Sequence, residues 1–293
     1  MQTQHRGFFY GALAAICYGT NPFGALYLYK AGFSPDSVLF YRFLGATLLS
    51  ALFILFLRKD FRIPKENLPT ISLLGVLFAV SALALYSSFL FMDAGVASTL
   101  LFAYPVMVAV FMAVFYKEKI QLKTVLSIFL ALGGVALLMR TSDGNTLSPK
   151  GILLVFLSSL SYAVYIIVAA HIPKPMGALK MNMAVFGICS VCLALYSLCM
   201  PGHSIAPLQN PAQFLWAFQL ALVPSLLSLV LMQKALRTIG STPTAILGAL
   251  EPLTAVCIGV GVFHETLSPR LLIGILLILG GVTLLAIKKS GSH

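Results

Sequence analysis

Residues Glu251 to Leu285 read EPLTAVCIGVGVFHETLSPRLLIGILLILGGVTLL, and an earlier part of the chain repeats the spacing of this stretch. Three landmarks recur 147 positions apart: a proline, an acidic residue and a glycine pair, present as Pro105, Glu118 and Gly133-Gly134 and again as Pro252, Glu265 and Gly280-Gly281. Gly7 and Tyr18 likewise recur as Gly151 and Tyr162, 144 positions further on. A shared separation over so many positions indicates an internal duplication, with one copy at residues 1–145 and the other at 146–293.

The composition is typical of a protein that is surrounded by lipid. Hydrophobic residues make up 59% of the 293 residues and charged residues only 9%, against about 45–50% and about 25% in soluble domains. The formal net charge of +11 would suggest nucleic-acid binding in a soluble protein, but here the basic residues form short clusters between apolar runs. Such clusters set membrane topology. We therefore expect a membrane protein that binds no nucleic acid.

The cysteines give no indication of a cofactor. All five lie inside apolar runs, as Cys17, Cys189, Cys192, Cys199 and Cys257, where they are expected to pack as small hydrophobic residues. Cys189 and Cys192 have the spacing of a redox or zinc pair, but no second pair accompanies them, so we expect no metal site. The chain also has no GxxxxGK[ST] motif, so ATP is not expected to drive its activity directly.

Ten apolar runs are each about 20 residues long, which is the length that crosses a bilayer as a helix. They are residues 8–29, 36–57, 70–91, 96–116, 122–140, 151–170, 179–200, 213–233, 241–263 and 270–287. The first run is not expected to be a signal peptide, because its counterpart 151–170 lies in the middle of the chain. Five spans per copy is an odd number, so the second copy enters the membrane from the opposite side. The predicted fold is all-α, with ten transmembrane helices in two inverted five-helix repeats.

The distribution of basic residues predicts the orientation. With the N-terminus in the cytoplasm, fourteen lysines and arginines fall in cytoplasmic segments and four, Lys30, Arg140, Lys150 and Arg270, in outer ones. This excess predicts that both termini are cytoplasmic and that the protein lies in the plasma or inner membrane.

Four prolines fall inside the predicted spans, where each removes one backbone hydrogen bond and kinks the helix. They are Pro22, Pro105, Pro224 and Pro252. Such bends are tolerated in many membrane helices. Because Pro105 and Pro252 occupy equivalent positions in the two copies, we interpret this pair as hinges.

The sequence resembles the EamA branch of the drug/metabolite transporter superfamily. The resemblance is carried, in order, by YGTNPF at 18–23, YRF at 41–43, YP at 104–105, YKEK at 116–119, LEPL at 250–253 and FHET at 263–266. It covers nearly the whole chain in two consecutive copies. It implies two inverted five-helix bundles around a central cavity, and export of small metabolites, amino acids among them.

Inverted repeats place a substrate site at their interface, near the middle of the bilayer. Two charged residues, Arg42 and Glu251, lie well inside predicted spans. A charged group there is costly unless it faces a cavity or finds a partner. Glu251 either binds a substrate amine or a coupling proton, or forms a structural hydrogen bond at the Pro252 kink. Arg42 either binds a substrate carboxylate or pairs with Glu251, or is a packed or snorkelling arginine.

Several neutral residues are further candidates for the cavity, since an amphipathic metabolite needs apolar walls with a few polar contacts. They are Tyr18, Asn21, Tyr41, Tyr86, Tyr104, Tyr162, Ser225 and Ser228. Tyrosines also serve as packing residues or interfacial anchors, so only some are expected to reach the cavity. Glu118 and Glu265 fall at helix ends on opposite sides and are interpreted as structural.

These features predict a secondary transporter that exports small amphipathic metabolites, such as amino acids, by alternating access between the two repeats. A channel-like or receptor membrane protein without a transport cycle is the alternative. An enzyme is not expected, because no paired catalytic groups are visible and no catalytic residue is proposed. The expected partners are a small-molecule substrate and the lipid bilayer, and a homodimer is left open.

Overall fold

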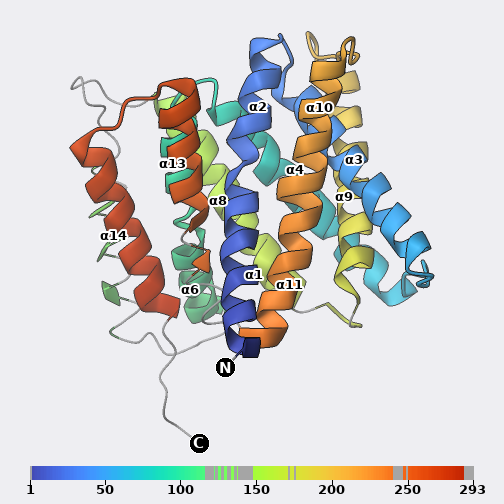
Figure 1. Cartoon of the computed structure of the whole chain (residues 1–293), viewed down its shortest axis with the longest axis horizontal. Helices are drawn as coiled ribbons and strands as arrows, with labels where there is room; N and C mark the ends of the chain where they lie inside the picture. The colour runs from blue at the N-terminus through green and yellow to red at the C-terminus, as the bar shows by residue number, and fades with distance from the viewer. Residues whose placement is uncertain are drawn as a thin grey trace, which may run out of the picture.

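The computed structural model describes residues 2–115, single positions between 122 and 137, and residues 148–170, 172–174, 176–239, 247–248 and 250–286. Every regular element in this part of the chain is a helix (Figure 1). The elements of the first copy are α1 (Gln2–Gly19), α2 (Asn21–Lys30), α3 (Pro35–Phe56), η1 (Lys65–Asn67), α4 (Leu68–Ser88), α5 (Ala94–Leu101) and α6 (Tyr104–Phe115). Those of the second copy are α8 (Pro149–Ala170), α9 (Ala178–Cys199), α10 (Pro211–Leu220), η2 (Ala221–Leu227), α11 (Ser228–Ile239), α13 (Leu250–Phe263) and α14 (Pro269–Ala286).

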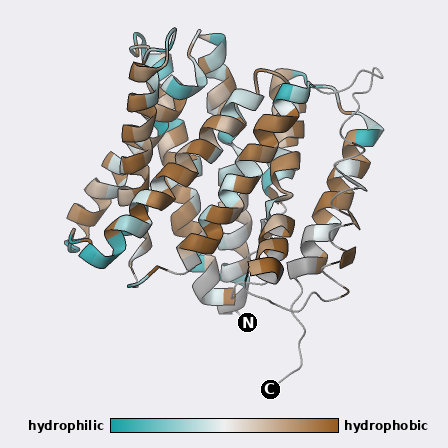
Figure 2. Cartoon of the chain, turned by 180° about the vertical axis from the view of Figure 1, so that it is seen from behind, coloured by the Kyte–Doolittle hydropathy of each residue, from teal (hydrophilic) through white to brown (hydrophobic). Residues whose placement is uncertain are grey.

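Five helical segments are long and apolar enough to cross a membrane. They are Pro35–Phe56, Lys65–Ser88, Pro149–Ala169, Ala178–Cys199 and Pro211–Ala235, and shorter apolar helices cover Ala94–Val108, Leu250–Phe263 and Pro269–Gly281. Figure 2 shows hydrophobic residues along the middle of the helices and hydrophilic residues at their ends. The described part of the chain is therefore a multi-pass helical membrane protein. The predicted span 122–140 lies outside the described residues apart from single positions.

Two predicted spans are interrupted, at two of the prolines for which the sequence predicts a kink. The span 8–29 breaks at Thr20 into α1 and α2, and the span 96–116 breaks at residues 102–103 into α5 and α6. Each break lies just before a proline, Pro22 in one case and Pro105 in the other. A proline has no N–H to donate to the carbonyl four residues earlier, so the regular ladder ends there.

Side chains satisfy the carbonyl groups that the prolines leave without a helical donor. Asn21 Nδ2 donates to the Tyr18 carbonyl at 2.8 Å, four residues before Pro22. Ser159 Oγ donates at 3.3 Å to the carbonyl of Leu101, four residues before Pro105. Buried carbonyls in lipid must find a donor from the protein, so these contacts stabilise the breaks.

The helices pack in pairs drawn from the two predicted copies. α3 runs along α9, α4 along α8 and α9, α1 along α11, and α5 along α13. One hydrophobic core contains buried residues of both copies, among them Phe43 on α3, Tyr86 on α4 and Phe186 on α9. The copies are therefore interleaved, and a site between them draws residues from both.

Candidate functional site

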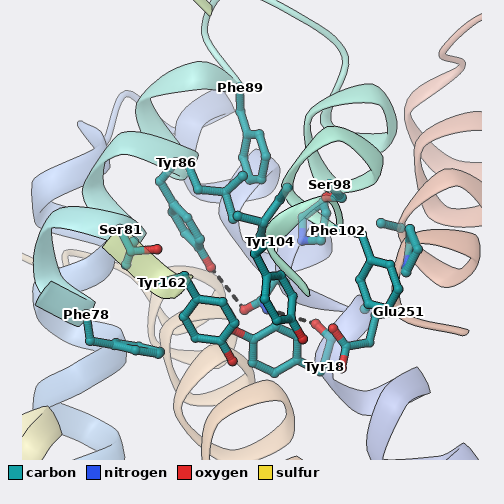
Figure 3. A pocket seen from close by; sticks show the side chains of 18 of the residues that line it. Tyr18, Phe78, Ser81, Tyr86, Phe89, Ser98, Phe102, Tyr104, Tyr162 and Glu251 are labelled. Carbon is teal, nitrogen blue, oxygen red and sulfur yellow. Dashed lines mark hydrogen bonds between the residues drawn. The ribbon is translucent and has the colours of Figure 1, made fainter. Parts of the chain in front are cut away.

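A cavity of about 50 Å³ lies where the broken helices meet. Its lining is aromatic and polar and comes from both copies, and Figure 3 shows most of these side chains pointing toward one another. The aromatic and polar lining residues are Tyr18, Asn21, Arg42, Phe78, Ser81, Tyr86, Phe89, Ser98, Phe102, Tyr104, Tyr162 and Glu251. Seven of these are site residues predicted from the sequence, namely Tyr18, Asn21, Arg42, Tyr86, Tyr104, Tyr162 and Glu251.

Arg42 is buried in the centre of this region, with 3% of its surface exposed. Its Nη1 donates to Tyr86 Oη at 3.0 Å and its Nε donates to Ser225 Oγ at 2.9 Å. Its Nη2 is buried and has no hydrogen-bond partner. A buried guanidinium that lacks one partner is costly. This nitrogen can therefore donate to an anionic group that enters the cavity.

A chain of hydrogen bonds extends from Arg42 to the break between α1 and α2. Tyr86 Oη, which accepts from Arg42, donates to Asn21 Oδ1 at 3.2 Å. The amide nitrogen of the same Asn21 holds the Tyr18 carbonyl. Asn21 thus supports the freed backbone and connects it to the buried charge.

Ser225 holds Arg42 from the opposite side. It lies in η2, a π-helical segment that contains Pro224. Since Pro224 has no N–H, the carbonyl of Leu220 loses the donor that a regular α-helix would give it, four residues on. Ser225 Oγ donates to this carbonyl at 2.9 Å and accepts from Arg42 Nε. The Ser225 hydroxyl therefore connects the π-helical segment of the second copy to the buried guanidinium of Arg42 in the first copy.

Glu251 lies in the first turn of α13, next to Pro252. Figure 3 shows its side chain beside Tyr18 and Tyr104. The end of α1 approaches it closely, because a Cβ placed on Gly19 would lie 2.6 Å from the Glu251 carbonyl oxygen. Among the described residues no ion pair joins Arg42 to Glu251. Of the alternatives left open for Arg42, the structure therefore does not show the pairing with Glu251, and Arg42 is bonded to Tyr86 and Ser225 instead.

Aromatic rings form one wall of the cavity. The rings of Tyr104 and Tyr162 meet at right angles, with their centroids 4.7 Å apart and an interplanar angle of 80°. Phe78 packs against Tyr162 at 6.0 Å and Phe102 against Tyr104 at 5.8 Å. The cavity therefore presents π-faces and hydroxyl groups together, as an amphipathic ligand requires.

Three predicted site residues do not line the cavity. Tyr41 Oη donates to the Ala206 carbonyl at 2.9 Å, in the loop before α10. Ser228 Oγ donates to the Ala14 carbonyl at 3.0 Å and so joins α11 to α1. Ser225 reaches the site only through Arg42.

Five of these aromatic and polar lining residues were not predicted from the sequence, namely Phe78, Ser81, Phe89, Ser98 and Phe102. Phe78 and Ser81 lie on α4 together with Tyr86, and Phe89 directly follows its last residue, so the four occur as two pairs with a spacing of three. That helical spacing was present in the sequence. Ser81 Oγ also donates to the backbone carbonyl of Ser158 on α8 at 3.0 Å, and Ser158 Oγ donates to the backbone carbonyl of Ser81 at 2.7 Å.

Both proline residues predicted as hinges lie at the start of helices. Pro105 is the second residue of α6 and Pro252 the third of α13, and Pro252 lines the cavity. The break between α5 and α6 also lies at the site, because Leu101, Phe102 and Tyr104 line the cavity.

Glu265, in the segment between α13 and α14, is bonded to the start of α5. Its carboxylate accepts from the backbone N–H of Ala94 at 2.8 Å and of Gly95 at 3.2 Å, at the start of α5. A carboxylate at a helix N-terminus is favourable for both hydrogen bonding and the helix dipole. Burial raises the pKa of Glu265, against the lowering effect of these two N–H groups. Glu265 thus clamps the two copies together. Its counterpart Glu118 lies outside the described residues.

An aromatic cluster lies beside the segment that holds Glu265. Tyr27 stacks on Trp216 with centroids 4.4 Å apart, and Phe23 meets Trp216 edge-on at 5.1 Å. Phe263 packs on Tyr27 at 5.3 Å, and the Lys30 ammonium lies 4.9 Å from the centre of the Phe263 ring. The cluster joins α2, α10 and α13.

The described part of the chain is thus a multi-pass helical bundle of the membrane-protein class, with a buried cavity lined by aromatic and polar residues of both halves. Comparison with known proteins identifies the family. The sequence model of the EamA-like transporter family matches this chain twice, at residues 5–140 and 149–287. The chain belongs to that family.

Several relatives are described as transporters. An uncharacterized transporter of Archaeoglobus fulgidus is 28% identical over 270 residues, which is 92% of each chain. The uncharacterized inner membrane transporter YedA of Escherichia coli K12 is 24% identical over 230 residues, covering 78% of this chain and 73% of YedA. A solved crystal structure aligns with a TM-score of 0.65 and 18% identity over 95% of this chain and 96% of that one. The last comparison shows a shared fold.

Proposed function

We propose that this protein is a secondary transporter that exports small amphipathic metabolites carrying both an amine and a carboxylate, such as amino acids. The observation that carries this proposal is the cavity itself, which has the guanidinium of Arg42 and the carboxylate of Glu251 in its lining. The two groups are not paired with each other. A zwitterion supplies one charge of each sign and can satisfy both.

Each end of such a substrate has a matching group. A carboxylate can accept from Arg42 Nη2, the nitrogen that lacks a partner. An amine can donate to Glu251, beside Tyr18 and Tyr104. The apolar part of the substrate can then pack on the aromatic wall formed by Tyr104, Tyr162 and Phe78. Hydrogen bonds to charged groups are about twice as strong as neutral ones, so these two contacts fix the orientation.

The size of the cavity supports an alternating-access cycle. Its volume is about 50 Å³, whereas sites for small organic ligands measure roughly 300–1,000 Å³. The helices must move apart before a metabolite fits. The breaks at Pro105 and Pro252 can act as hinges because they border the cavity. The Glu265 clamp and the Trp216 cluster close one end of the bundle in this state.

The packing of the helices supports the inverted-repeat arrangement with ten spans. In that arrangement α1–α2, α5–α6, α10–α11 and the segment ending in α13 count as single spans. The contact of α1 with α11 is then a contact of the first span with the eighth, and the contact of α4 with α8 is one of the third span with the sixth. Replacing each span by its counterpart in the other copy converts the contact of the first span with the eighth into the contact of the sixth with the third, as a two-fold relation between the copies requires.

The basic residues favour cytoplasmic termini in the plasma or inner membrane. A tag in the connector at residues 141–148 tests this, and a tag found in the cytosol would contradict it.

Uptake by proteoliposomes tests the transport proposal. Pure protein is reconstituted, loaded with unlabelled amino acid and exposed to the labelled amino acid, with protein-free liposomes as the control. We expect accumulation of label for zwitterionic amino acids, and none for the corresponding amine or carboxylate alone. Absence of exchange across a panel of amino acids would overturn the proposal.

Cysteine labelling of the cavity from each side separates a transporter, which exposes the cavity to one side of the membrane at a time, from a channel, which exposes it to both sides.

A further inference from the structure

A second hollow lies between α3, α9 and the η2–α11 segment, at the same end of the bundle as the N-terminus (Figure 1). Its volume is about 570 Å³, and it shares no lining residue with the central cavity. The helices separate there, since the end of α3 and the start of α9 form one wall and η2 and α11 the other. We call this hollow the basal groove.

The walls of the basal groove are apolar and open to the surroundings of the bundle. Phe53, Phe56 and Leu57 on one side are 44%, 82% and 47% exposed, and Leu227 on the other is 39% exposed. In a membrane protein such side chains contact acyl chains. The groove therefore offers a lipid-facing slot that side chains of the protein do not fill.

Three lysines from three different elements line one end of this slot. Lys59 follows α3, Lys180 lies in the first turn of α9 and Lys234 lies on α11. Asp60 is the one acidic residue in the groove lining as described, and Lys180 Nζ lies 3.4 Å from its Oδ2 while donating to the Arg62 carbonyl at 2.9 Å. Asp60 balances one lysine, so Lys59 and Lys234 leave the end of the groove positively charged.

We propose that the basal groove binds an anionic phospholipid, with the phosphate among Lys59, Lys180 and Lys234 and one acyl chain along the apolar walls. The shape and the charge both favour this occupant over a soluble anion, because the positive end continues into an apolar slot that opens toward the bilayer. Basic pockets between membrane helices bind anionic head groups in this way. The site is separate from the proposed transport function and does not depend on it.

The groove also borders the residues that hold Arg42. Leu222 and Leu226 line it from the π-helical segment, and Ser225 of the same segment bonds to Arg42 on the other side. A lipid in the groove packs directly on this segment. We therefore expect binding to stabilise the folded bundle as a whole.

Purified protein in a neutral detergent tests the proposal. Phosphatidylglycerol and phosphatidylcholine with identical acyl chains are added separately, and bound lipid is counted by native mass spectrometry while the melting temperature is recorded. We expect phosphatidylglycerol to bind and to raise the melting temperature, and phosphatidylcholine to bind much more weakly. Equal behaviour of the two lipids would overturn the proposal. A shift of the same size with inorganic phosphate alone would also overturn it, because the acyl chain would then play no part.

Two variants locate the site. The double variant Lys59→Gln with Lys234→Gln should weaken phosphatidylglycerol binding by roughly twenty- to thirtyfold, because each lysine near an anionic lipid contributes about a factor of five. Val230→Phe, which fills the slot and keeps every charge, should also reduce binding. Lys150→Gln, on the first turn of α8 at the other end of the bundle, is the matched control and should leave binding unchanged. Wild-type affinity in both groove variants would show that the lipid binds elsewhere.

Discussion

Arg42 on α3 donates from Nε to Ser225 Oγ on η2 at 2.9 Å, and this bond joins the buried charge of the first copy to a helix break of the second. The same hydroxyl donates to the Leu220 carbonyl, which Pro224 leaves without a helical donor. Ser225 therefore serves two groups: it donates to the Leu220 carbonyl, which has lost its α-helical donor, and it accepts from the Arg42 guanidinium. The position of Arg42 in the cavity depends on the shape of the π-helical segment.

Ser225→Ala should lower the stability of the protein. The substitution leaves Arg42 Nε without its acceptor in a buried site and removes the side-chain donor to the Leu220 carbonyl, and a buried donor that loses its partner costs about 1–3 kcal/mol. The melting temperature in detergent measures the effect. Ser72→Ala, on the exposed face of α4, is the control and should change stability by less than about 0.5 kcal/mol. Equal melting temperatures for the two variants would show that the shared serine is not required.

Glu251→Gln should reduce exchange of zwitterionic amino acids by about tenfold or more, while expression and melting temperature stay near wild type. The amide keeps the size of the side chain but removes the charge that an amine would meet, and contacts to charged groups contribute about 1.5–3 kcal/mol. Initial exchange rates in proteoliposomes measure this. Glu66→Gln removes an exposed carboxylate that bonds to Lys174 and should leave the rate unchanged. An undiminished rate in Glu251→Gln would remove Glu251 from the substrate site.

The sequence predicted seven residues of the cavity because buried charges and polar groups near helix-breaking prolines are costly unless they serve a site. It failed for Tyr41, which follows Phe40 and precedes Arg42 on α3. Adjacent residues on a helix point about 100° apart, and here Arg42 faces the cavity while Tyr41 donates to the Ala206 carbonyl. Which one does so depends on the neighbouring helices, and the sequence does not reveal these.

Ser225 and Ser228 show a second limit of the sequence. Their spacing of three puts both on one face of a regular α-helix. The intervening backbone is π-helical, which changes the angular step, so Ser225 meets Arg42 while Ser228 meets Ala14 on α1. A proline in the sequence predicts a break but does not predict its form. The ten apolar runs, by contrast, required only the length and composition of each segment.

The Glu265 clamp should make stability depend on pH in a defined direction. Burial raises the pKa of Glu265 despite the N–H groups of Ala94 and Gly95. A carboxyl whose pKa is higher in the folded state contributes stability that is fully present below its unfolded pKa and is lost as the pH rises through the folded value. The melting temperature of wild type should therefore lose ground to that of Glu265→Gln as the pH rises above the usual pKa range of a glutamate.

Glu66 provides a control of opposite sign for this pH series. Its hydrogen bond from Lys174 lowers its pKa, so its contribution is present at high pH and is lost as the pH falls. The difference between wild type and Glu66→Gln should be small, because the pair is exposed, and should not fall as the pH rises. A wild-type advantage over Glu265→Gln that grows with pH would contradict the role assigned to burial.

Trp216→Ala should open the end of the bundle that the aromatic cluster closes. The substitution removes the stack on Tyr27 and the edge contact with Phe23, and each aromatic pair contributes about 0.5–1.5 kcal/mol beyond its buried area. The open form should then be populated roughly fivefold more or higher, since about 1.4 kcal/mol corresponds to a factor of ten. The measurement is the labelling rate of Ser98→Cys, which lines the cavity, by a membrane-impermeant thiol reagent after the five native cysteines are replaced. Phe214→Ala removes an exposed ring of the same helix and should not change the rate. If Trp216→Ala labels no faster than this control, the aromatic cluster is packing and not a gate.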